Sequence, residues 1–267
     1  MKPPSVAYRR PESLAEALAD LAELGDRARP LAGGQSLVPL LALRLAQPEV
    51  LVGLERVAEL RGAELAADQL VIRAMTREAE LERAPALPAL LRAALGHIGH
   101  FQIRSRGTVG GSLAHMDPAA EWPALALLLD ATLTVASTRR GRRRLPAAAF
   151  IVGPLTTALE PDELLEAVTI ARPDDHFGFA EVERRSGDFA LVGAGCHGGR
   201  VVVFAAGPRP QRLAGVEAFL RDGGGPGPEL QQRARAEIEA RDDLHASAAY
   251  RRQVGARLVD QVVAAAS

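Results

Sequence analysis

Apolar residues near the start of the chain repeat at helical spacing. Those between Leu14 and Leu24 share one face of a predicted helix, and Gly25 follows as an expected C-cap. The pattern then predicts a strand, a glycine turn, a helix and a strand, over residues 29–32, 33–36, 37–46 and 50–54. This order is typical of an α/β unit.

The middle of the chain continues with both kinds of element. Strands are predicted over residues 70–74, 133–137, 143–145 and 164–170, and helices over residues 76–83 and 88–97. Thr76 is expected to cap its helix. Asp117 is expected to cap another helix, which starts at Pro118 and ends near Asp130.

The last third predicts a smaller sheet carrying helices. Three antiparallel strands are expected over residues 178–185, 189–195 and 200–205, and two helices over residues 229–241 and 247–265. We therefore predict an α+β fold with two domains. Their predicted limits are residues 1–173, with subdomains of about 1–55 and 56–173, and residues 174–267.

Composition removes several classes of partner. The 267 residues include 32 basic and 33 acidic side chains, so the formal net charge of -1 provides no long-range attraction for nucleic acid. The arginine-rich run 139–144 is interpreted as a solvated turn or as the rim of a subunit contact. No apolar stretch of about 18 residues occurs and the start does not resemble a secretory signal, which favours a cytoplasmic protein without a membrane segment.

The single cysteine limits the redox chemistry of the chain. Cys196 cannot form an internal disulfide, and it cannot hold an iron-sulfur cluster, which usually needs about four thiolates. We interpret it as an ordinary turn cysteine. None of the six histidines forms a metal-binding pattern such as HExxH, so any metal centre is expected in another chain.

Two glycine-rich loops carry the chemistry. The first is Gly33-Gly34-Gln35-Ser36 and the second is Gly107-Thr108-Val109-Gly110-Gly111-Ser112. Adjacent glycines let the backbone approach an anion and direct several N–H groups at it. The first loop alone is equally consistent with a tight turn and a serine cap, but two such loops suit the two phosphates of a dinucleotide.

A third glycine pattern is rejected. Residues 193–198 match GxGxxG, yet the apolar run 200–204 that follows predicts a strand and not the helix that a Rossmann motif requires. We interpret this match as a hairpin turn.

Three segments together resemble a known family. AGGQSL at 32–37, IGHFQIRSRGTVGGSLAHMDPAAEWPA at 98–124 and RRSGDFALVGAG at 184–195 are similar to the FAD-binding medium subunits of molybdenum hydroxylases, the family of carbon monoxide dehydrogenase and xanthine dehydrogenase. The resemblance extends to residues 242–259. It implies a vanillyl-alcohol-oxidase (PCMH)-type FAD domain followed by a small C-terminal domain.

The resemblance also implies roles for individual residues. Those expected to hold FAD are Ala32, Gly33, Gly34, Gln35, Ser36 and Leu37 of the first loop, Thr108, Val109, Gly110, Gly111 and Ser112 of the second, and Ile98, Glu121, Leu165 and Phe189 elsewhere. Phe189 is the candidate lid over the isoalloxazine ring. Asp117 is either a helix cap or a further cofactor contact, and the alternative for Glu121 is a place on a solvated helix face.

By the same resemblance, this chain contributes no catalytic residue of its own. Substrate is expected to react at a molybdopterin in a large subunit, and electrons to pass through iron-sulfur clusters of a small subunit to FAD here, in a dimer of heterotrimers. One departure is Glu181, where many relatives carry a lysine, so a positive charge near the flavin is absent or comes from Arg184 or Arg185. The alternatives are a stand-alone flavin oxidoreductase and a nucleotide-binding regulatory module.

Overall fold

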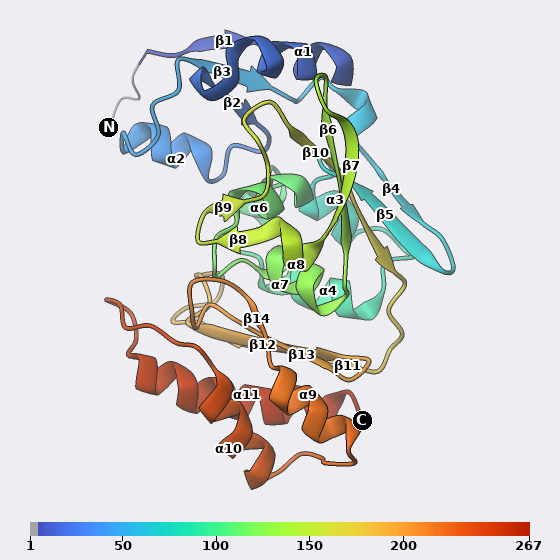
Figure 1. The fold of residues 1–267 in the computed structure, drawn as a ribbon, viewed down its shortest axis with the longest axis vertical. Helices are drawn as coiled ribbons and strands as arrows, with labels where there is room; N and C mark the ends of the chain where they lie inside the picture. Colours follow the sequence, from blue (N-terminus) through green and yellow to red (C-terminus); the bar gives the residue numbers. More distant parts are fainter. Residues whose placement is uncertain (1–4) are drawn as a thin grey trace.

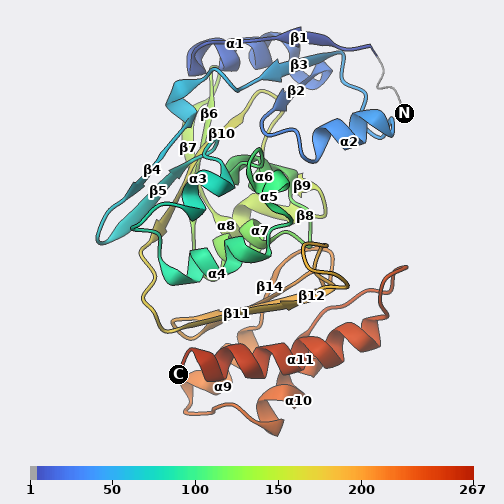
Figure 2. The ribbon, with the colours of Figure 1, turned by 180° about the vertical axis from the view of Figure 1, so that it is seen from behind.

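The computed structural model describes residues 5–267, which stack as three sheets along the long axis of the molecule. The N-terminal sheet lies at one end and the C-terminal sheet with its helices lies at the other (Figure 1). The view from behind shows the same order, with the central sheet between them (Figure 2). The predicted mixture of helices and sheets, an α+β fold, is confirmed.

The N-terminal sheet is the predicted α/β unit. It is parallel in the order β1-β3-β2, built from Ala7–Arg9, Val50–Gly53 and Ala28–Leu31. Helix α1 (Leu14–Leu24) buries its predicted apolar face, and the Ser13 hydroxyl accepts a hydrogen bond from the Glu16 N–H. Helix α2 (Leu37–Ala42) is shorter than predicted, because the backbone turns to a positive φ at Arg44.

The central sheet is antiparallel and has five strands. Its order is β4-β5-β10-β6-β7, over Ala63–Leu65, Gln69–Arg73, Leu164–Ala171, Thr132–Ser137 and Gly141–Pro146. Its helices are α3 (Glu78–Glu82), α4 (Ala89–His97), α5 (Phe101–Arg104), α6 (Val109–His115), α7 (Glu121–Leu128) and α8 (Ala147–Phe150). A small hairpin of β8 (Ile151–Gly153) and β9 (Thr156–Thr157) follows, and short 3-10 turns cover Gly25–Arg27 and Ala58–Leu60.

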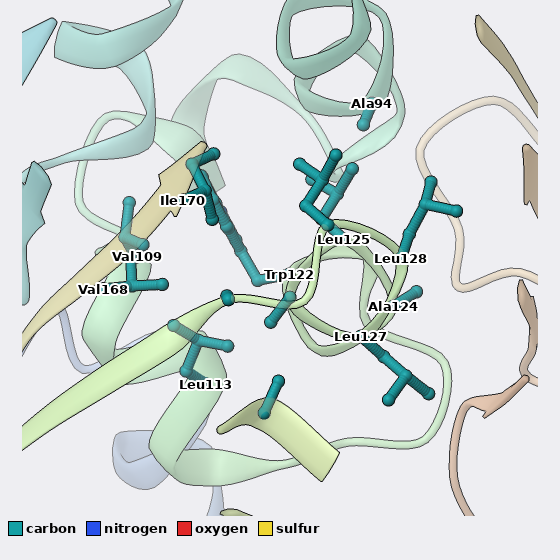
Figure 3. Packing of buried hydrophobic residues seen from close by; sticks show 14 of the residues in the cluster. Ala94, Val109, Leu113, Trp122, Ala124, Leu125, Leu127, Leu128, Val168 and Ile170 are labelled. Atoms are coloured by element: carbon teal, nitrogen blue, oxygen red, sulfur yellow. The ribbon is translucent and has the colours of Figure 1, made fainter. Parts of the chain in front are cut away.

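Helix α7 forms the centre of the largest hydrophobic core. All eight of its residues are buried, because other elements surround it on every side. Figure 3 shows Trp122 extending from α7 toward Ile170, while Leu125 lies on the side of Ala94. A helix that is apolar all round belongs in a core, so α7 is a fixed support for whatever binds beside it.

The C-terminal sheet has four strands where three were predicted. It is antiparallel in the order β11-β12-β13-β14, over Phe177–Val182, Val192–His197, Arg200–Phe204 and Gln211–Arg212. The fourth strand has only two residues, too few to give an alternating pattern. Helices α9 (Ala214–Arg221), α10 (Pro228–Glu237) and α11 (Ala248–Ala265) cover one face, and α9 was also missed. The division of the chain at residue 173 stays a prediction.

Several local predictions were wrong. Thr76 does not cap α3, because its hydroxyl donates to the Gly62 carbonyl; Arg77 holds the cap position. Asp117 does not cap α7, which begins after Ala120. Cys196 lies inside β12 and not in a turn, and its burial raises the pKa of the thiol to about 11. The rejection of residues 193–198 as a Rossmann motif is confirmed, since they lead through a hairpin into β13.

The arginine-rich run is largely paired within the chain. Arg140 contacts Asp162, Arg142 contacts Glu166 and Arg143 contacts Glu163. These pairs join the β6–β7 turn and strand β7 to the start of β10 and the residues just before it, across the intervening strand β6. Among the helices of residues 5–267, none combines the length and the apolar character needed to span a membrane.

Candidate functional site

The two glycine loops lie against each other. A Cβ placed on Gly33 would overlap the carbonyl group of Arg106, and a Cβ on Gly111 would lie 3.4 Å from the Cβ of Ala32. Gly34 has a φ of +76°, a conformation in which a side chain is strained. The structure therefore brings both loops together, from segments more than 70 residues apart, as one continuous surface.

The first loop has free hydrogen-bond donors. None of the backbone N–H groups of residues 33–37 donates to another residue of the described chain. The Gln35 side chain donates to the Gly33 carbonyl at 3.2 Å, and the Ser36 hydroxyl makes no cap bond to α2. Residues 32–35 and Leu37 are half-buried and Ser36 is exposed. Because unpaired N–H groups cost free energy unless a partner reaches them, this loop fits an anionic group such as a diphosphate.

The second loop is different, because the backbone N–H groups of residues 109–112 already donate within the chain. The N–H groups of Val109 and Gly110 donate to the carbonyls of Thr76 and Ala74 at 3.1 and 2.8 Å. The N–H of Gly111 donates to the Thr108 hydroxyl at 3.1 Å, which caps α6. This loop anchors α6 to the central sheet and supports the first loop. The prediction of two equivalent donor loops was therefore wrong for the backbone of residues 109–111.

Ile98 lies in a turn that an arginine holds in place. Arg104 donates to the carbonyls of Ile98 and Gly99 at 3.0 and 2.9 Å, and its Nε donates to Glu82 at 3.0 Å. Ile98 itself is buried at the end of α4. The turn that carries this predicted contact residue is thus fixed before any ligand binds.

Two glutamates of this region are buried, and one of them contacts the second loop. Glu78 touches Gly107, since a Cβ on that glycine would come within 2.5 Å of the Glu78 Oε2, and burial raises the Glu78 pKa to about 7. Burial also raises the pKa of Glu121 to about 8, helped by repulsion from Glu78, Asp117 and Glu183. The solvated-face reading of Glu121 was wrong, because this side chain is buried at the start of α7.

Glu181 extends this set of acids to the C-terminal sheet. Its side chain is 0% exposed, and its Oε1 lies 3.7 Å from the Nδ1 of His97 at the end of α4. Burial, followed by repulsion from Glu121 and Glu183, raises its pKa to about 8. Arg184 and Arg185 are exposed. The position therefore holds a buried carboxyl with a raised pKa, where the sequence indicated only a missing positive charge.

The remaining predicted site residues, Phe189, Leu165 and Asp117, differ in how far they are buried. Phe189 is 68% exposed in the loop before β12, outside the strand that was predicted to contain it. Leu165 is buried in β10, next to a bulge. The Asp117 carboxylate accepts from the Ala119 N–H at 2.9 Å, so it closes a local turn between α6 and α7. The Phe189 ring takes part in none of the contacts described above, so it is available to cover a ligand.

Sequence reasoning missed Glu78, His97 and Arg104 as members of this region. Each comes from an element where a charged residue has an ordinary surface explanation, such as an acid in the first turn of α3. Their proximity depends on contacts between α3, α4, α5 and β11, and local periodicity does not reveal such contacts. A glutamate at position 181 on the inward face of a strand was the only available signal.

Comparison with protein families matches nearly the whole chain. Residues 4–173 match the family described as FAD binding domain in molybdopterin dehydrogenase. Residues 177–266 match the family described as CO dehydrogenase flavoprotein C-terminal domain.

Individual relatives are similar at between a third and two fifths identity. The 6-hydroxypseudooxynicotine dehydrogenase complex subunit alpha of Paenarthrobacter nicotinovorans is 37% identical over 100% of this chain and 96% of its own length. The nicotine 6-hydroxylase medium subunit of the same organism is 36% identical over 98% of both chains. The carbon monoxide dehydrogenase medium chain of Hydrogenophaga pseudoflava is 39% identical over 72% of this chain and 69% of its own.

Solved structures agree with the sequence relatives. A carbon monoxide dehydrogenase from Hydrogenophaga pseudoflava that lacks the Mo-pyranopterin moiety of its cofactor superposes with a TM-score of 0.92 at 34% identity, over 100% of this chain and 98% of that one. Quinoline 2-oxidoreductase from Pseudomonas putida 86 gives a TM-score of 0.90 at 36% identity, with the same coverage.

Proposed function

Because the chain belongs to the family of FAD-binding medium subunits of molybdenum hydroxylases, we propose that its glycine loops hold FAD and that the bound flavin relays electrons from partner subunits to an external acceptor. The chain is an FAD-containing oxidoreductase subunit, and its PCMH-type fold class is that of carbon monoxide dehydrogenase medium chains.

The first loop supports the proposed diphosphate site most strongly. Five consecutive N–H groups, of residues 33–37, have no partner in the described chain, and they lie between a fixed strand and a short helix. Backbone donors of this kind recognise phosphate oxygens without a side-chain charge. In the second loop, we propose that Thr108 and Val109 hold the start of α6 against the central sheet. The Ser112 hydroxyl has no hydrogen-bond partner in the described chain, and we assign it to contact with the cofactor.

We assign Ile98, Glu121, Leu165 and Phe189 to contacts with the flavin, as in the family that the chain belongs to. The turn at Ile98 is held by Arg104, while Phe189 is exposed and available to cover the ring. Asp117 is assigned to a further cofactor contact, from a position where its carboxylate closes the turn between α6 and α7. FAD supplies the exchange between one-electron and two-electron carriers, and this chain supplies its position and surroundings.

The single cysteine supports a division of labour between chains. One thiol cannot ligate an iron-sulfur cluster, so the electrons must come from clusters held elsewhere. We assign the clusters to a small subunit and the molybdopterin to a large subunit, in a dimer of heterotrimers. Relatives of similar identity are named for substrates as different as nicotine and carbon monoxide, which is expected if another subunit selects the substrate.

Purification of the chain with its natural partners tests this function. We expect flavin, molybdenum and iron in the complex, and flavin alone in this subunit after dissociation. Reduction of the flavin by substrate only in the presence of the partners would support a relay. Substrate oxidation by the isolated subunit would favour a stand-alone flavin enzyme, and a bound nucleotide without flavin absorbance would favour a regulatory module.

A further inference from the structure

The connection from β11 to β12 carries an exposed aromatic ring on a backbone that is held behind it. We name residues 183–189 the Phe189 loop, and Phe189 itself is 68% exposed. The next residue, Ala190, is buried in the largest core. The Leu191 carbonyl accepts a hydrogen bond at 3.0 Å from Arg251, a buried side chain of α11. The chain is therefore fixed immediately after Phe189, although the ring itself is free.

Gly187 is a second fixed point of the Phe189 loop. Its N–H donates to the Glu183 carboxylate at 3.1 Å, which closes a local turn. Its φ is +86°, and a Cβ placed on it would lie 2.5 Å from both Nδ1 and Cε1 of the His100 ring. No other positive-φ glycine in residues 5–267 would bring a Cβ so close to a neighbour. A positive φ alone accounts for a glycine in a turn, but it does not account for this contact.

His100 belongs to a turn whose backbone is held by hydrogen bonds. Its carbonyl accepts from the N–H groups of Ile103 and Arg104 at 2.8 and 3.2 Å. The Arg104 side chain in turn donates to the Ile98 carbonyl at 3.0 Å. The ring on which Gly187 rests is therefore attached to a rigid turn, two residues after a proposed flavin contact.

The contact joins the surroundings of two residues that we assign to the flavin. Ile98 lies in the part of the chain that matches the FAD-binding family, and Phe189 in the part that matches the C-terminal family. We propose that His100 is a positioning residue, whose ring supports Gly187 and thereby fixes the place of Phe189 beside the turn of residues 98–100. This inference rests on the proposed function. A fixed backbone lowers the entropy that an exposed ring loses when it packs on a planar ligand.

Hydrogen exchange of the full chain without flavin tests the support itself. The Asp188 N–H donates to the Arg185 carbonyl at 2.9 Å, within the turn that rests on His100. We expect His100→Ala to lower the protection of this amide by about 10-fold, because the loop loses its contact. His100→Phe keeps a planar ring and should retain the wild-type protection. Unchanged protection in His100→Ala would overturn the inference.

Gly187→Ala disturbs the same contact from the other side. Its Cβ would overlap the His100 ring, whereas Gly223→Ala has a similar φ of +89° and meets nothing within 4 Å. We expect the Asp188 amide to lose protection in Gly187→Ala and to keep it in Gly223→Ala. Combining Gly187→Ala with His100→Ala should add little, because both changes remove one contact. Fully additive effects would contradict a shared contact.

The role toward the flavin is measured in the complex purified with its natural partners. Phe189→Trp serves as a reporter, because an indole packed against a flavin quenches its fluorescence. We expect quenching in Phe189→Trp, its loss when His100→Ala is added, and its return with His100→Phe. A merely structural role of His100 would not change this signal in a complex that keeps its flavin.

The outcomes separate this inference from the proposed function. Flavin-loaded Phe189→Trp without quenching would overturn the inference, and so would quenching that persists in the presence of His100→Ala. Both results would leave the binding of FAD by the glycine loops intact. A wild-type complex without flavin would instead overturn the proposed function, and the role of His100 toward the flavin with it.

Discussion

The two glycine loops are similar in composition, but they differ in whether their backbone N–H groups are hydrogen-bonded within the chain. In residues 33–37 the N–H groups have no partner in the described chain, whereas those of residues 109–111 are bonded to Thr76, Ala74 and Thr108. Ser36 makes no cap bond, while Thr108 caps α6. The first loop is therefore equipped to bind an anion, and the second to hold the first in position.

This difference shows that glycine content alone does not identify donors. A glycine pair permits close approach, but the partner can be a ligand or another part of the chain. At Gly110 it is the chain, since a Cβ there would overlap Ala74. Variants that affect binding and stability separately can distinguish these roles.

The largest effect is expected for Gly33→Ala. The added Cβ would overlap the Arg106 carbonyl, so the two loops would have to separate and the free N–H groups would lose their alignment. We expect FAD affinity to fall by more than about 10²-fold, or roughly 3 kcal/mol, in a titration followed by flavin fluorescence. Gly96→Ala, in α4 where nothing lies within 4 Å of the new Cβ, should bind FAD as the wild type does. Equal affinity of both variants would contradict the contact between the loops.

Gly111→Asp is expected to have the next largest effect. Its Cβ would lie 2.7 Å from the Thr108 hydroxyl, and its carboxylate would enter the space between the loops beside Ala32. Because the FAD diphosphate is an anion, we expect the purified variant to lose its flavin while its circular dichroism is retained. Gly96→Asp is the matched control. An undiminished flavin content in Gly111→Asp would exclude a diphosphate from this position.

Two buried glutamates, Glu121 of α7 and Glu181 of β11, predict that stability depends on pH. Glu121 and Glu181 have pKa values raised from 4.5 to about 8, so their contribution is fully present below about pH 4.5 and is lost as the pH rises through 8. Each pKa unit corresponds to about 1.4 kcal/mol. Chemical denaturation of the flavin-free chain should show a lower free energy of unfolding at pH 9 than at pH 5, with a smaller decrease in Glu181→Gln. An identical decrease in both proteins would show that Glu181 is ionised throughout.

The smallest effects are expected from substitutions at the N-termini of α6 and α2. Thr108→Ala removes a cap bond and should lower the free energy of unfolding by about 1 kcal/mol. Ser36→Ala removes no bond within the chain, so it should leave that free energy unchanged and weaken FAD binding only slightly. Denaturation and flavin titration of both variants measure the two quantities. A loss of stability in Ser36→Ala, with none in Thr108→Ala, would contradict the roles assigned to the two loops.

Local structure could be predicted well where one element determines it. The helix over residues 14–24, with its Ser13 and Gly25 ends, follows from periodicity and capping. The hairpin around Gly141 follows from its flanking strands. The expectation that both glycine loops meet at one place was also correct, because the resemblance to a family supplied the long-range information.

The parts that could not be predicted depend on contacts distant in sequence. The bonds from Val109 and Gly110 to Thr76 and Ala74 consume the donors of the second loop, and no local pattern indicates them. Asp117 was misassigned because proline at the next position suggested a helix start, while the chain first makes a separate turn. Glu78 appears ordinary in sequence and Glu181 was noticed only as a departure from relatives; packing is what makes both of them buried acids.

Hydrogen exchange of the backbone amides, with and without FAD, tests the assignment of the loops most directly. The account predicts that FAD strongly slows exchange at residues 34–37 and changes little at residues 109–111, whose N–H groups are already bonded. Unchanged exchange at residues 34–37 in the flavin-loaded chain would contradict it.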